Sequence, residues 1–412
     1  MIIKLIIVVA LFAITLGIAA YLTLMERKVA AWMQDRIGPD RAGPFGLLQP
    51  LADGGKMFFK EDFRPTNADK WLFIIGPGIA MFTSLITGAV IPWGPDLKIA
   101  GESIALQVAD VNIGILFIMG AVSIGVYGIM IGGWASNNKY SLLGAIRASS
   151  QMISYELAMG LALLSIIMMT GSLDLKVITE NQTEGKLWGI IPIGSGMNWN
   201  IFYQPVAFLV FFVAALAETN RHPFDLPECE SELVTGYSTE YSSMKLGLYM
   251  FGEYVNMFIS NAFMVVLFFG GYNYPGIEWV TQNLGENTAG ILSIVAFLTK
   301  TVIGILIFMW IRWTLPRFRY DQLMHLGWKT LIPMALTITS GLNYTSNKLY
   351  TGLIQNYSGN AGFSKTLLKN KLIISTSNSF ILTKPLNGTG KIWNFGGNVS
   401  YLPIKGHRLS LR

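Results

Sequence analysis

The chain has very few of the residues from which redox and metal centres are usually built. Its 412 residues include one cysteine and three histidines. A single cysteine excludes a disulfide within the chain, and it cannot supply the thiolates of an iron–sulfur cluster or a cysteine-based zinc site. Three histidines make a haem or multi-histidine metal centre unexpected. Any electrons that this protein uses must therefore be carried by other molecules.

Charged residues are also scarce. They make up 13% of the chain, whereas a soluble domain carries about 25%. Hydrophobic residues reach 52%, and the mean hydropathy is +0.47. This balance indicates a polytopic helical membrane protein and argues against an ordinary soluble enzyme.

Eight apolar stretches are each close to the roughly 20 residues that a helix needs to cross a bilayer. They lie at 5–25, 71–93, 113–135, 157–173, 201–217, 254–277, 289–311 and 330–347. We expect an all-α fold with eight transmembrane helices. The first stretch lacks the small-residue cleavage site of a signal peptide, so we expect it to remain as a helix. Residues 37–60 predict an additional amphipathic helix along the membrane interface.

Lysine and arginine in the connecting segments predict the orientation. The odd-numbered loops contain sixteen of these residues and the even-numbered loops contain three. Because basic loops remain on the cytoplasmic or matrix side, we expect the odd loops there. Both ends of the helical bundle are then expected on the opposite face.

Residues 341–412 differ in character from the rest of the chain. They contain nine Lys and Arg and no acidic residue, whereas residues 1–340 contain 21 basic and 24 acidic residues. The net charge of +6 therefore comes from this tail and does not indicate nucleic-acid binding by the body. Short alternating pieces at 371–382 and 398–412 predict β-like or disordered structure. We expect a membrane domain at 1–340 and an atypical basic tail at 341–412, which is a fusion or appendage or else an assembly extension.

Six carboxylates are crowded into a 23-residue segment in which Arg221 is the one basic residue. They are Glu218, Asp225, Glu228, Glu230, Glu232 and Glu240. The segment also contains apolar and proline residues, which a fully solvated loop would not require. Crowded carboxylates beside a low-dielectric region cannot all ionise, so such a group can store and pass protons.

Further ionisable residues occur at or within the predicted spans. Glu26, Glu156 and Glu253 flank the predicted helices, where snorkelling alone explains many charges. Lys300 lies near the middle of the seventh span, where a charge costs several kcal/mol and usually marks a pathway or a buried partner. We therefore place Lys300 on the proton path, with a structural ion pair as the alternative.

A second polar segment combines Glu26, Arg27, Arg36 and Asp53 with the glycines and prolines of residues 37–54. Glycine and proline fix tight turns there, and the arginines could pair with acids of the other polar segment. The sequence contains no phosphate-binding loop, dinucleotide fingerprint, Ser/His/Asp arrangement or HExxH motif. No nucleotide binding is expected.

Two long motifs, ERKVAAWMQDRIGPDRAGPFGLLQPLADGGKMFFKE and AETNRHPFDLPECESELVTGYSTEYSSMKLGLYMFGEY, resemble the signatures of one family of membrane subunits. It is the family of the H subunit (subunit 1 of the mitochondrial enzyme) of proton-pumping NADH:quinone oxidoreductase, complex I. Residues 310–324 resemble a third signature, and the likeness extends from residue 1 to about 335. The resemblance implies an eight-helix subunit that joins the hydrophilic arm to the membrane arm. Such a subunit forms most of the quinone chamber, starts the proton path and is not catalytic alone.

The resemblance also implies roles for individual residues. The quinone chamber would include Glu26, Arg27, Arg36 and Asp53. The proton path would include Glu156, Glu218, Asp225, Glu228, Glu230, Glu232, Glu240 and Glu253. We add Lys300 to this path because it lies deep in its predicted span. Arg147 and Arg221 would be the counter-charges. Cys229 departs from the glycine or alanine common in the family, and the tail has no counterpart there.

Quinone, either ubiquinone or menaquinone, is the expected substrate, with no flavin, iron–sulfur cluster, nucleotide or metal bound by this chain. The expected partners are the quinone-site and iron–sulfur subunits of the hydrophilic arm, adjacent membrane subunits and lipid, with no nucleic acid. The expected location is the bacterial plasma (inner) membrane, with the mitochondrial inner membrane as the alternative. Two other functions stay open: the homologous membrane subunit of a proton-translocating hydrogenase, and a stand-alone ion transporter, although no internal repeat supports the latter.

Overall fold

The structure is a computed structural model that describes the backbone of most of the chain. The described backbone covers residues 2–99, 102–183, 186–187, 191–192, 196–226, 234–340, 344–349, 352–367, 372–384, 390–401 and 409–411. Side chains are described for residues 8–96, 105–183, 196–226, 234–283 and 285–336. Three predicted proton-path residues, Glu228, Glu230 and Glu232, lie outside the described residues.

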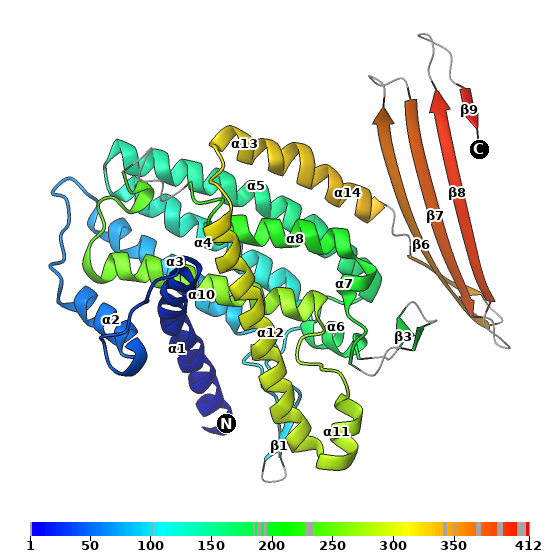
Figure 1. Ribbon diagram of the computed structural model, residues 1–412, viewed down its shortest axis with the longest axis horizontal. Helices are drawn as coiled ribbons and strands as arrows, with labels where there is room; N and C mark the ends of the chain where they lie inside the picture. The colour runs from blue at the N-terminus through cyan, green and yellow to red at the C-terminus, as the bar shows by residue number, and fades with distance from the viewer. Residues whose placement is uncertain are drawn as a thin grey trace.

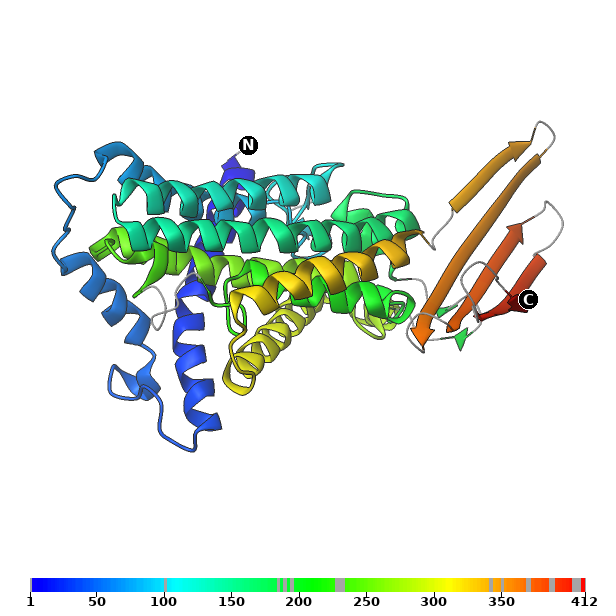
Figure 2. The same cartoon turned by 90° about the horizontal axis from the view of Figure 1, so that it is seen from above.

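The body is a bundle of helices (Figure 1). Its larger helices are α1 (Ile2–Met33), α3 (Lys70–Gly88), α4 (Gly114–Ala135), α5 (Lys139–Thr170), α8 (Pro205–Glu218), α10 (Ser243–Phe268) and α12 (Glu286–Thr314). The shorter ones are η1 (Pro44–Gly46), α2 (Gln49–Phe59), α6 (Leu175–Asn181), α7 (Asn200–Tyr203), η2 (Gly236–Ser238), α11 (Ile277–Leu284), α13 (Tyr320–His325), the π-helix η3 (Leu326–Leu331) and α14 (Ile332–Ser340). In both views α4, α5 and α10 run in nearly the same direction, while α1 and α12 cross them steeply (Figures 1 and 2).

Six of these helices, α1, α3, α4, α5, α10 and α12, are long and apolar enough to cross a membrane. This finding confirms that the body is a helical membrane protein. The fifth predicted span is divided between the four residues of α7 and the 14 residues of α8. The eighth predicted span, 330–347, corresponds to the end of η3 and to α14, which ends at Ser340. Its last residues are not helical, because they belong to strand β5 (Tyr344–Leu349).

Several predicted helix boundaries are wrong, and the errors share one cause. Helix α1 continues past Glu26 to Met33, so Glu26 lies inside the helix. Glu156 and Glu253 likewise lie inside α5 and α10, which begin at Lys139 and Ser243 in segments predicted to be loops. A prediction from hydropathy places the end of a span at its first charged residue. The helix itself can continue past that residue where neighbouring protein groups compensate the charge.

Close packing of α3 and α4 depends on glycine. A Cβ atom added to Gly128 would lie 2.8 Å from the backbone nitrogen of Ala80 on α3, so a larger residue would separate the two helices. The hydroxyl of Tyr249 on α10 donates to the Gly128 carbonyl oxygen at 2.9 Å. Helix α10 packs against α3, α12 and α1 and is the most buried of the six candidate spans. It therefore forms the centre of the bundle.

The tail folds as a five-stranded antiparallel sheet in the order β5-β6-β7-β8-β9. Its strands are β5 (Tyr344–Leu349), β6 (Gly352–Leu367), β7 (Leu372–Lys384), β8 (Gly390–Tyr401) and β9 (Leu409–Leu411). Two small hairpins, β1 (Leu97–Ile99) with β2 (Glu102–Ile104) and β3 (Lys186–Leu187) with β4 (Ile191–Pro192), belong to the body. The tail sheet and α2 lie at opposite ends of the bundle (Figures 1 and 2).

Candidate functional site

A buried carboxylate on α1 is the first element of the site. Glu26 is 5% exposed, and its two oxygens accept hydrogen bonds from Nη1 of Arg221 at 3.1 and 3.0 Å. The hydroxyl of Tyr254 on α10 donates to the same carboxylate at 2.7 Å, and Nη1 of Arg312 on α12 also donates to it. Two cations and one hydroxyl from three other parts of the chain therefore hold Glu26 in the bundle.

Arg221 is the buried cation that connects this carboxylate to the rest of the site. It follows α8 after a turn in which Asn220 has a left-handed φ of 51°. Its guanidinium lies 4.3 Å from the ring centroid of Tyr254, a cation–π arrangement. Burial lowers the pKa of Arg221, but attraction by Glu26, Tyr254 and Glu253 outweighs burial and raises it above its ordinary value. Arg221 is therefore a fixed positive charge between Glu26 and Glu253.

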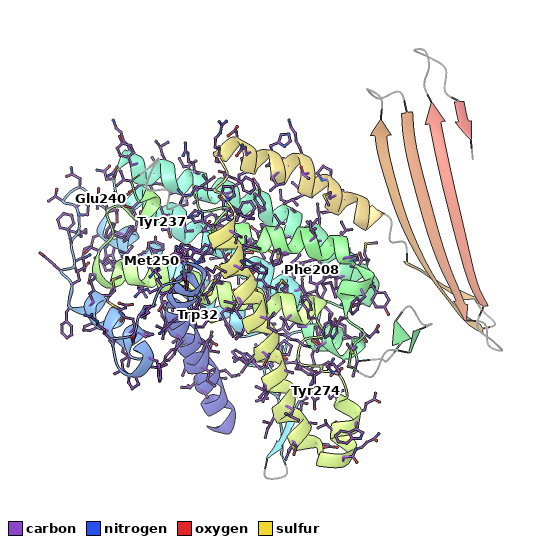
Figure 3. The ribbon with its side chains drawn as sticks, in the orientation of Figure 1. Trp32, Phe208, Tyr237, Glu240, Met250 and Tyr274 are labelled. Atoms are coloured by element: carbon purple, nitrogen blue, oxygen red, sulfur yellow. The ribbon has the colours of Figure 1, made fainter. Side chains whose placement is uncertain are left out.

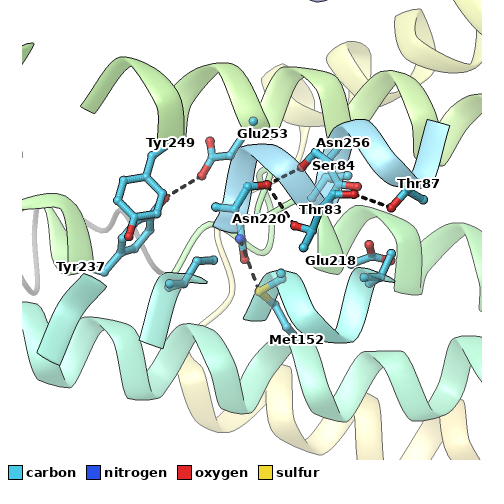
Figure 4. Close-up of a pocket in the computed structure, with 16 residues that line it drawn as sticks. Thr83, Ser84, Thr87, Met152, Glu218, Asn220, Tyr237, Tyr249, Glu253 and Asn256 are labelled. Carbon is cyan, nitrogen blue, oxygen red and sulfur yellow. Dashed lines mark hydrogen bonds between the residues drawn. The ribbon is translucent and has the colours of Figure 1, made fainter. Parts of the chain in front are cut away.

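A cavity of about 50 Å³, lined by both polar and apolar side chains, lies in the interior of the bundle (Figure 4). Glu218, at the end of α8, lines it and is 4% exposed. The Asn256 amide donates to the Glu218 carboxylate, and the charge of Glu156 repels it. Glu156, from α5, accepts a hydrogen bond from the hydroxyl of Ser123 on α4. Two carboxylates thus share one wall of the bundle interior.

Glu253 lines the same cavity from α10. The hydroxyl of Tyr237 donates to Oε1 of Glu253 at 3.0 Å, and Figure 4 shows the two carboxylates, Glu218 and Glu253, at different places along the cavity. Figure 3 places Tyr237 near the end of the bundle where Glu240 also lies. The cavity therefore connects a carboxylate on α8 with one on α10.

The polar part of the cavity lining is suited to water. Thr83, Ser84 and Thr87 of α3 donate their hydroxyl protons to backbone carbonyls of their own helix at 2.8–2.9 Å, which leaves acceptor lone pairs. The buried Oδ1 of Asn220 has no hydrogen-bond partner among the described residues. About 10–15 Å³ is sufficient for one water, so this cavity has room for a short chain of waters.

The loop after α8 is held by further ion pairs and hydrogen bonds. Oδ2 of Asp225 lies 3.0 Å from Nη2 of Arg317 and 3.1 Å from Nε2 of His222. Nε2 of Gln151 on α5 donates to the carbonyls of Ala217 and Phe224, each at 2.8 Å. Glu240 accepts from the Asn138 amide at 2.6 Å. These contacts fix the described part of the acidic segment against α5 and the segment between α12 and α13.

The remaining predicted quinone-chamber residues are more exposed than Glu26. Nη1 of Arg27 lies 2.8 Å from Oδ2 of Asp53 on α2, and the two side chains are 50% and 34% exposed. Arg36 is exposed just beyond α1, where its Nε donates to Gln34 at 2.7 Å. Helix α2 is amphipathic, and Phe59 at its end is 90% exposed.

Lys300 makes contacts that the sequence does not predict, and Arg147 has a contact with an aromatic ring. The Nζ of Lys300 donates to the backbone carbonyls of Phe269, Gly271 and Asn273, in the turn that follows α10, and lies 5.0 Å from the ring centroid of Trp199. An ammonium group has three donors, so these bonds use all of them. Arg147 lies over the ring of Tyr320 at 5.8 Å.

Several residues of the site are absent from the sequence-based prediction. They are Arg312, Tyr254, Asn256, Ser123 and the hydroxyl residues of α3. The spacing of Thr83, Ser84 and Thr87 on one apolar helix is a visible signal, because polar groups in a span usually face a cavity or partner. For Arg312 the sequence offers no such signal, since its partner Glu26 is 286 residues away.

Comparison with known proteins identifies one family and several relatives that carry the same enzyme name. Residues 5–340 match the family described as NADH dehydrogenase. The chain is 60% identical over 333 residues to the H subunit of the NADH-quinone oxidoreductase of Flavobacterium psychrophilum, covering 81% of this chain and 94% of that protein. It is 62% identical over 333 residues to the H 1 subunit of the Cytophaga hutchinsonii enzyme (81% and 93%) and 49% identical over 326 residues to the H 1 subunit of the Geobacter metallireducens enzyme (79% and 91%). The matched residues of the family end at 340, where the tail begins.

Proposed function

The chain belongs to the NADH dehydrogenase family, and on this premise we infer that it is the membrane subunit of NADH:quinone oxidoreductase that couples quinone reduction to proton translocation. It is part of a multisubunit enzyme and is not catalytic alone. The relatives carry the name of the quinone oxidoreductase, which favours this function over the hydrogenase subunit and the stand-alone transporter.

The observation that carries the proposal is a series of interacting polar groups inside the bundle, of which Glu26, Arg221 and Glu218 are buried and Glu253 and Glu156 are half-buried. It runs from Glu26 through Arg221 to Glu253, and through the cavity to Glu218 and Glu156. A unit charge that appears ~10 Å away changes the energy of a site by about 1.7 kcal/mol at an effective dielectric of about 20. Such a change shifts a protonation equilibrium more than tenfold. A charge arriving at the quinone site can therefore change the protonation of the carboxylates behind it.

We propose that the quinone headgroup is bound beside Glu26, Arg27, Arg36 and Asp53. Glu26 is held between two cations, so it stays a fixed acceptor, whereas the Arg27–Asp53 pair is accessible to a ligand. The exposed aromatic side chains of α2 offer the isoprenoid tail an apolar surface at the membrane interface. The proposal includes either ubiquinone or menaquinone as the substrate.

The proposed proton path begins at the acidic segment and continues into the cavity. Its members on the segment are Asp225, Glu228, Glu230, Glu232 and Glu240, of which Asp225 and Glu240 are held in place by ion pairs or amide bonds. Its members in the bundle are Glu253, Glu218 and Glu156. Arg221 and Arg147 are the proposed counter-charges. Lys300 is proposed as a fixed cation near the path, because its three donors are engaged by carbonyls.

The same proposal covers the organisation in the membrane. Helices α7 and α8 together, and the pieces α13, η3 and α14 together, complete eight spans in a bacterial inner membrane. The partners are the quinone-site and iron–sulfur subunits of the hydrophilic arm, adjacent membrane subunits and lipid. Flavin and iron–sulfur clusters are assigned to those partners. Residues 341–412 form a separate appendage with no part in proton pumping.

The replacement Glu218→Gln tests the proposal in the assembled complex. It removes the charge and keeps the shape and the contact with Asn256, so NADH:quinone turnover is expected to fall at least about tenfold, as for loss of a proton-transfer group. Electron transfer from NADH to an artificial acceptor upstream of the quinone is expected to be unchanged. Glu278→Gln, at an exposed carboxylate on α11, is the matched control. Full quinone turnover in assembled Glu218→Gln complexes would exclude Glu218 from the path.

A further inference from the structure

The register of the tail sheet separates its residues into two chemically distinct faces. Strand β6 pairs with β7 so that Phe363 is opposite Thr376, and β7 pairs with β8 so that Phe380 is opposite Trp393. Residues alternate between faces along a strand, and this register places all the aromatic residues of the five strands on one face. They are Tyr344, Tyr357, Phe363, Phe380, Trp393, Phe395 and Tyr401.

All the charged residues of the five strands occupy the same face as these aromatics. They are Lys348, Lys365, Lys384 and Lys391. We call this the aromatic face; its other members include Leu372, Ile374, Val399, Leu409 and Leu411, with a few polar residues near its middle. The opposite, polar face contains Ser, Thr, Asn and Gly with a few aliphatic residues, and it has no charged or aromatic residue within the strands.

This separation is the reverse of that in an ordinary soluble sheet. In a soluble antiparallel sheet the charged residues face water and the aromatic residues face the core. Here the lysines accompany the aromatics, and the uncharged polar residues form the other face. Aromatic rings with lysine beside them, and aliphatic residues between them, are the combination that binds the headgroup region of a bilayer.

The position of the sheet limits what it can meet. Strand β5 begins at Tyr344, four residues after α14 ends at Ser340. A connection of this length spans at most roughly 14 Å, so the sheet cannot move far from the end of α14. Under the proposed function, on which this inference rests, α14 lies in the membrane. In both views the strands cross the direction of α5 and α10 steeply (Figures 1 and 2).

We propose that the aromatic face of the tail sheet binds the surface of the membrane that contains the helices, with its lysines on anionic phospholipid headgroups. The tail carries nine basic and no acidic residues, which complements an anionic lipid surface. The same uniform charge repels a second copy of the tail. The two edge strands, β5 and β9, leave backbone groups that could not be satisfied within the hydrocarbon, so the sheet lies on the bilayer and does not span it.

The test uses the full chain in the assembled complex, with its single cysteine replaced (Cys229→Ala) and new cysteines introduced one at a time. Phe380→Cys and Trp393→Cys lie on the aromatic face, and their neighbours Ser379→Cys and Asn394→Cys are the matched controls on the polar face. Each cysteine carries an environment-sensitive fluorophore in liposomes that contain brominated phosphatidylglycerol. Quenching is expected to be at least about threefold stronger on the aromatic face than on the polar face.

The second part of the test asks whether the quenching depends on charge. The quadruple replacement of Lys348, Lys365, Lys384 and Lys391 by Gln, or liposomes of brominated phosphatidylcholine, is expected to bring the two faces towards equal quenching. High salt is expected to act in the same direction. Equal quenching of both faces in phosphatidylglycerol would overturn the proposal. Two other results would also overturn it. In the first, labels on the aromatic face are protected from both the lipid and a water-soluble quencher, which would show that another protein covers this face. In the second, the labels respond to an added oligonucleotide and not to lipid.

Discussion

Removing the Arg221 guanidinium is the perturbation whose effect the structure defines most completely. The side chains of Arg221 and Glu26 are 8% and 7% exposed, so Arg221→Gln leaves a buried carboxylate without its main counter-charge. Breaking a buried ion pair by removing one partner costs about 3–5 kcal/mol. Because Arg312 and Tyr254 still donate to Glu26, we expect a smaller loss, about 2–4 kcal/mol.

The control for this loss is an ion pair of similar chemistry in a different environment. Arg27 and Asp53 are 50% and 34% exposed, and pairs of this kind contribute about 0–1 kcal/mol. The assay is the temperature at which half of the NADH:quinone activity of the purified complex is lost in a fixed incubation. Arg221→Gln is expected to lower it by at least about 5 °C, and Arg27→Gln is expected to change it little.

The double variant Glu26→Gln/Arg221→Gln provides the decisive comparison. It removes both charges of the pair, and the side chain of Arg312, which is 28% exposed, can be solvated. We therefore expect the double variant to be more heat-stable than Arg221→Gln alone. If Arg221→Gln is as stable as Arg27→Gln, or if adding Glu26→Gln brings no recovery, the buried cluster does not have the energetic role assigned to it.

Three further predictions concern other parts of the chain. Arg36→Ala should weaken quinone-dependent activity and sensitivity to quinone-site inhibitors together, since both need the same site; normal inhibitor sensitivity would contradict the placement of Arg36. Lys300→Gln leaves two or more buried carbonyls without a hydrogen-bond donor, at a cost of about 1–3 kcal/mol each. It should therefore lower the heat stability of the complex but leave the number of protons pumped per electron unchanged in complexes that assemble. Loss of pumping at normal heat stability would show that Lys300 carries protons. Truncation after residue 343 should leave assembly and NADH:quinone activity unchanged, and failed assembly would refute the appendage proposal.

The membrane body can be predicted from the sequence because a span is a local property. About 20 apolar residues in succession identify a helix without any knowledge of its neighbours, and α1, α3, α4, α5, α10 and α12 are recognisable in this way. The ends of these helices depend on distant contacts. Helix α1 continues past Glu26 because Arg221 and Arg312 compensate the charge of its carboxylate. These two partners lie 195 and 286 residues away in the sequence.

The candidate site can likewise be predicted only in part. Crowding marks Glu218 as unusual and the resemblance implies a role for Glu253, but nothing in their spacing indicates that a cavity joins them. The hydroxyls of α3 and the amide of Asn256 complete that cavity from helices that are far apart in the sequence. The depth of Lys300 in its span marks it as a residue that needs a partner. Its carbonyl partners cannot be predicted, because they depend on how the turn after α10 packs against α12.

The central claim is that quinone reduction drives protons through the Glu218 cavity, and the most direct test measures both processes in one preparation. The complex is reconstituted in sealed liposomes, and NADH oxidation by quinone and proton translocation are recorded together for the unaltered chain, Glu218→Gln and the Glu278→Gln control. The account predicts that both rates fall together in Glu218→Gln and stay unchanged in the control. Full rates of quinone reduction and proton translocation in assembled Glu218→Gln complexes would contradict it.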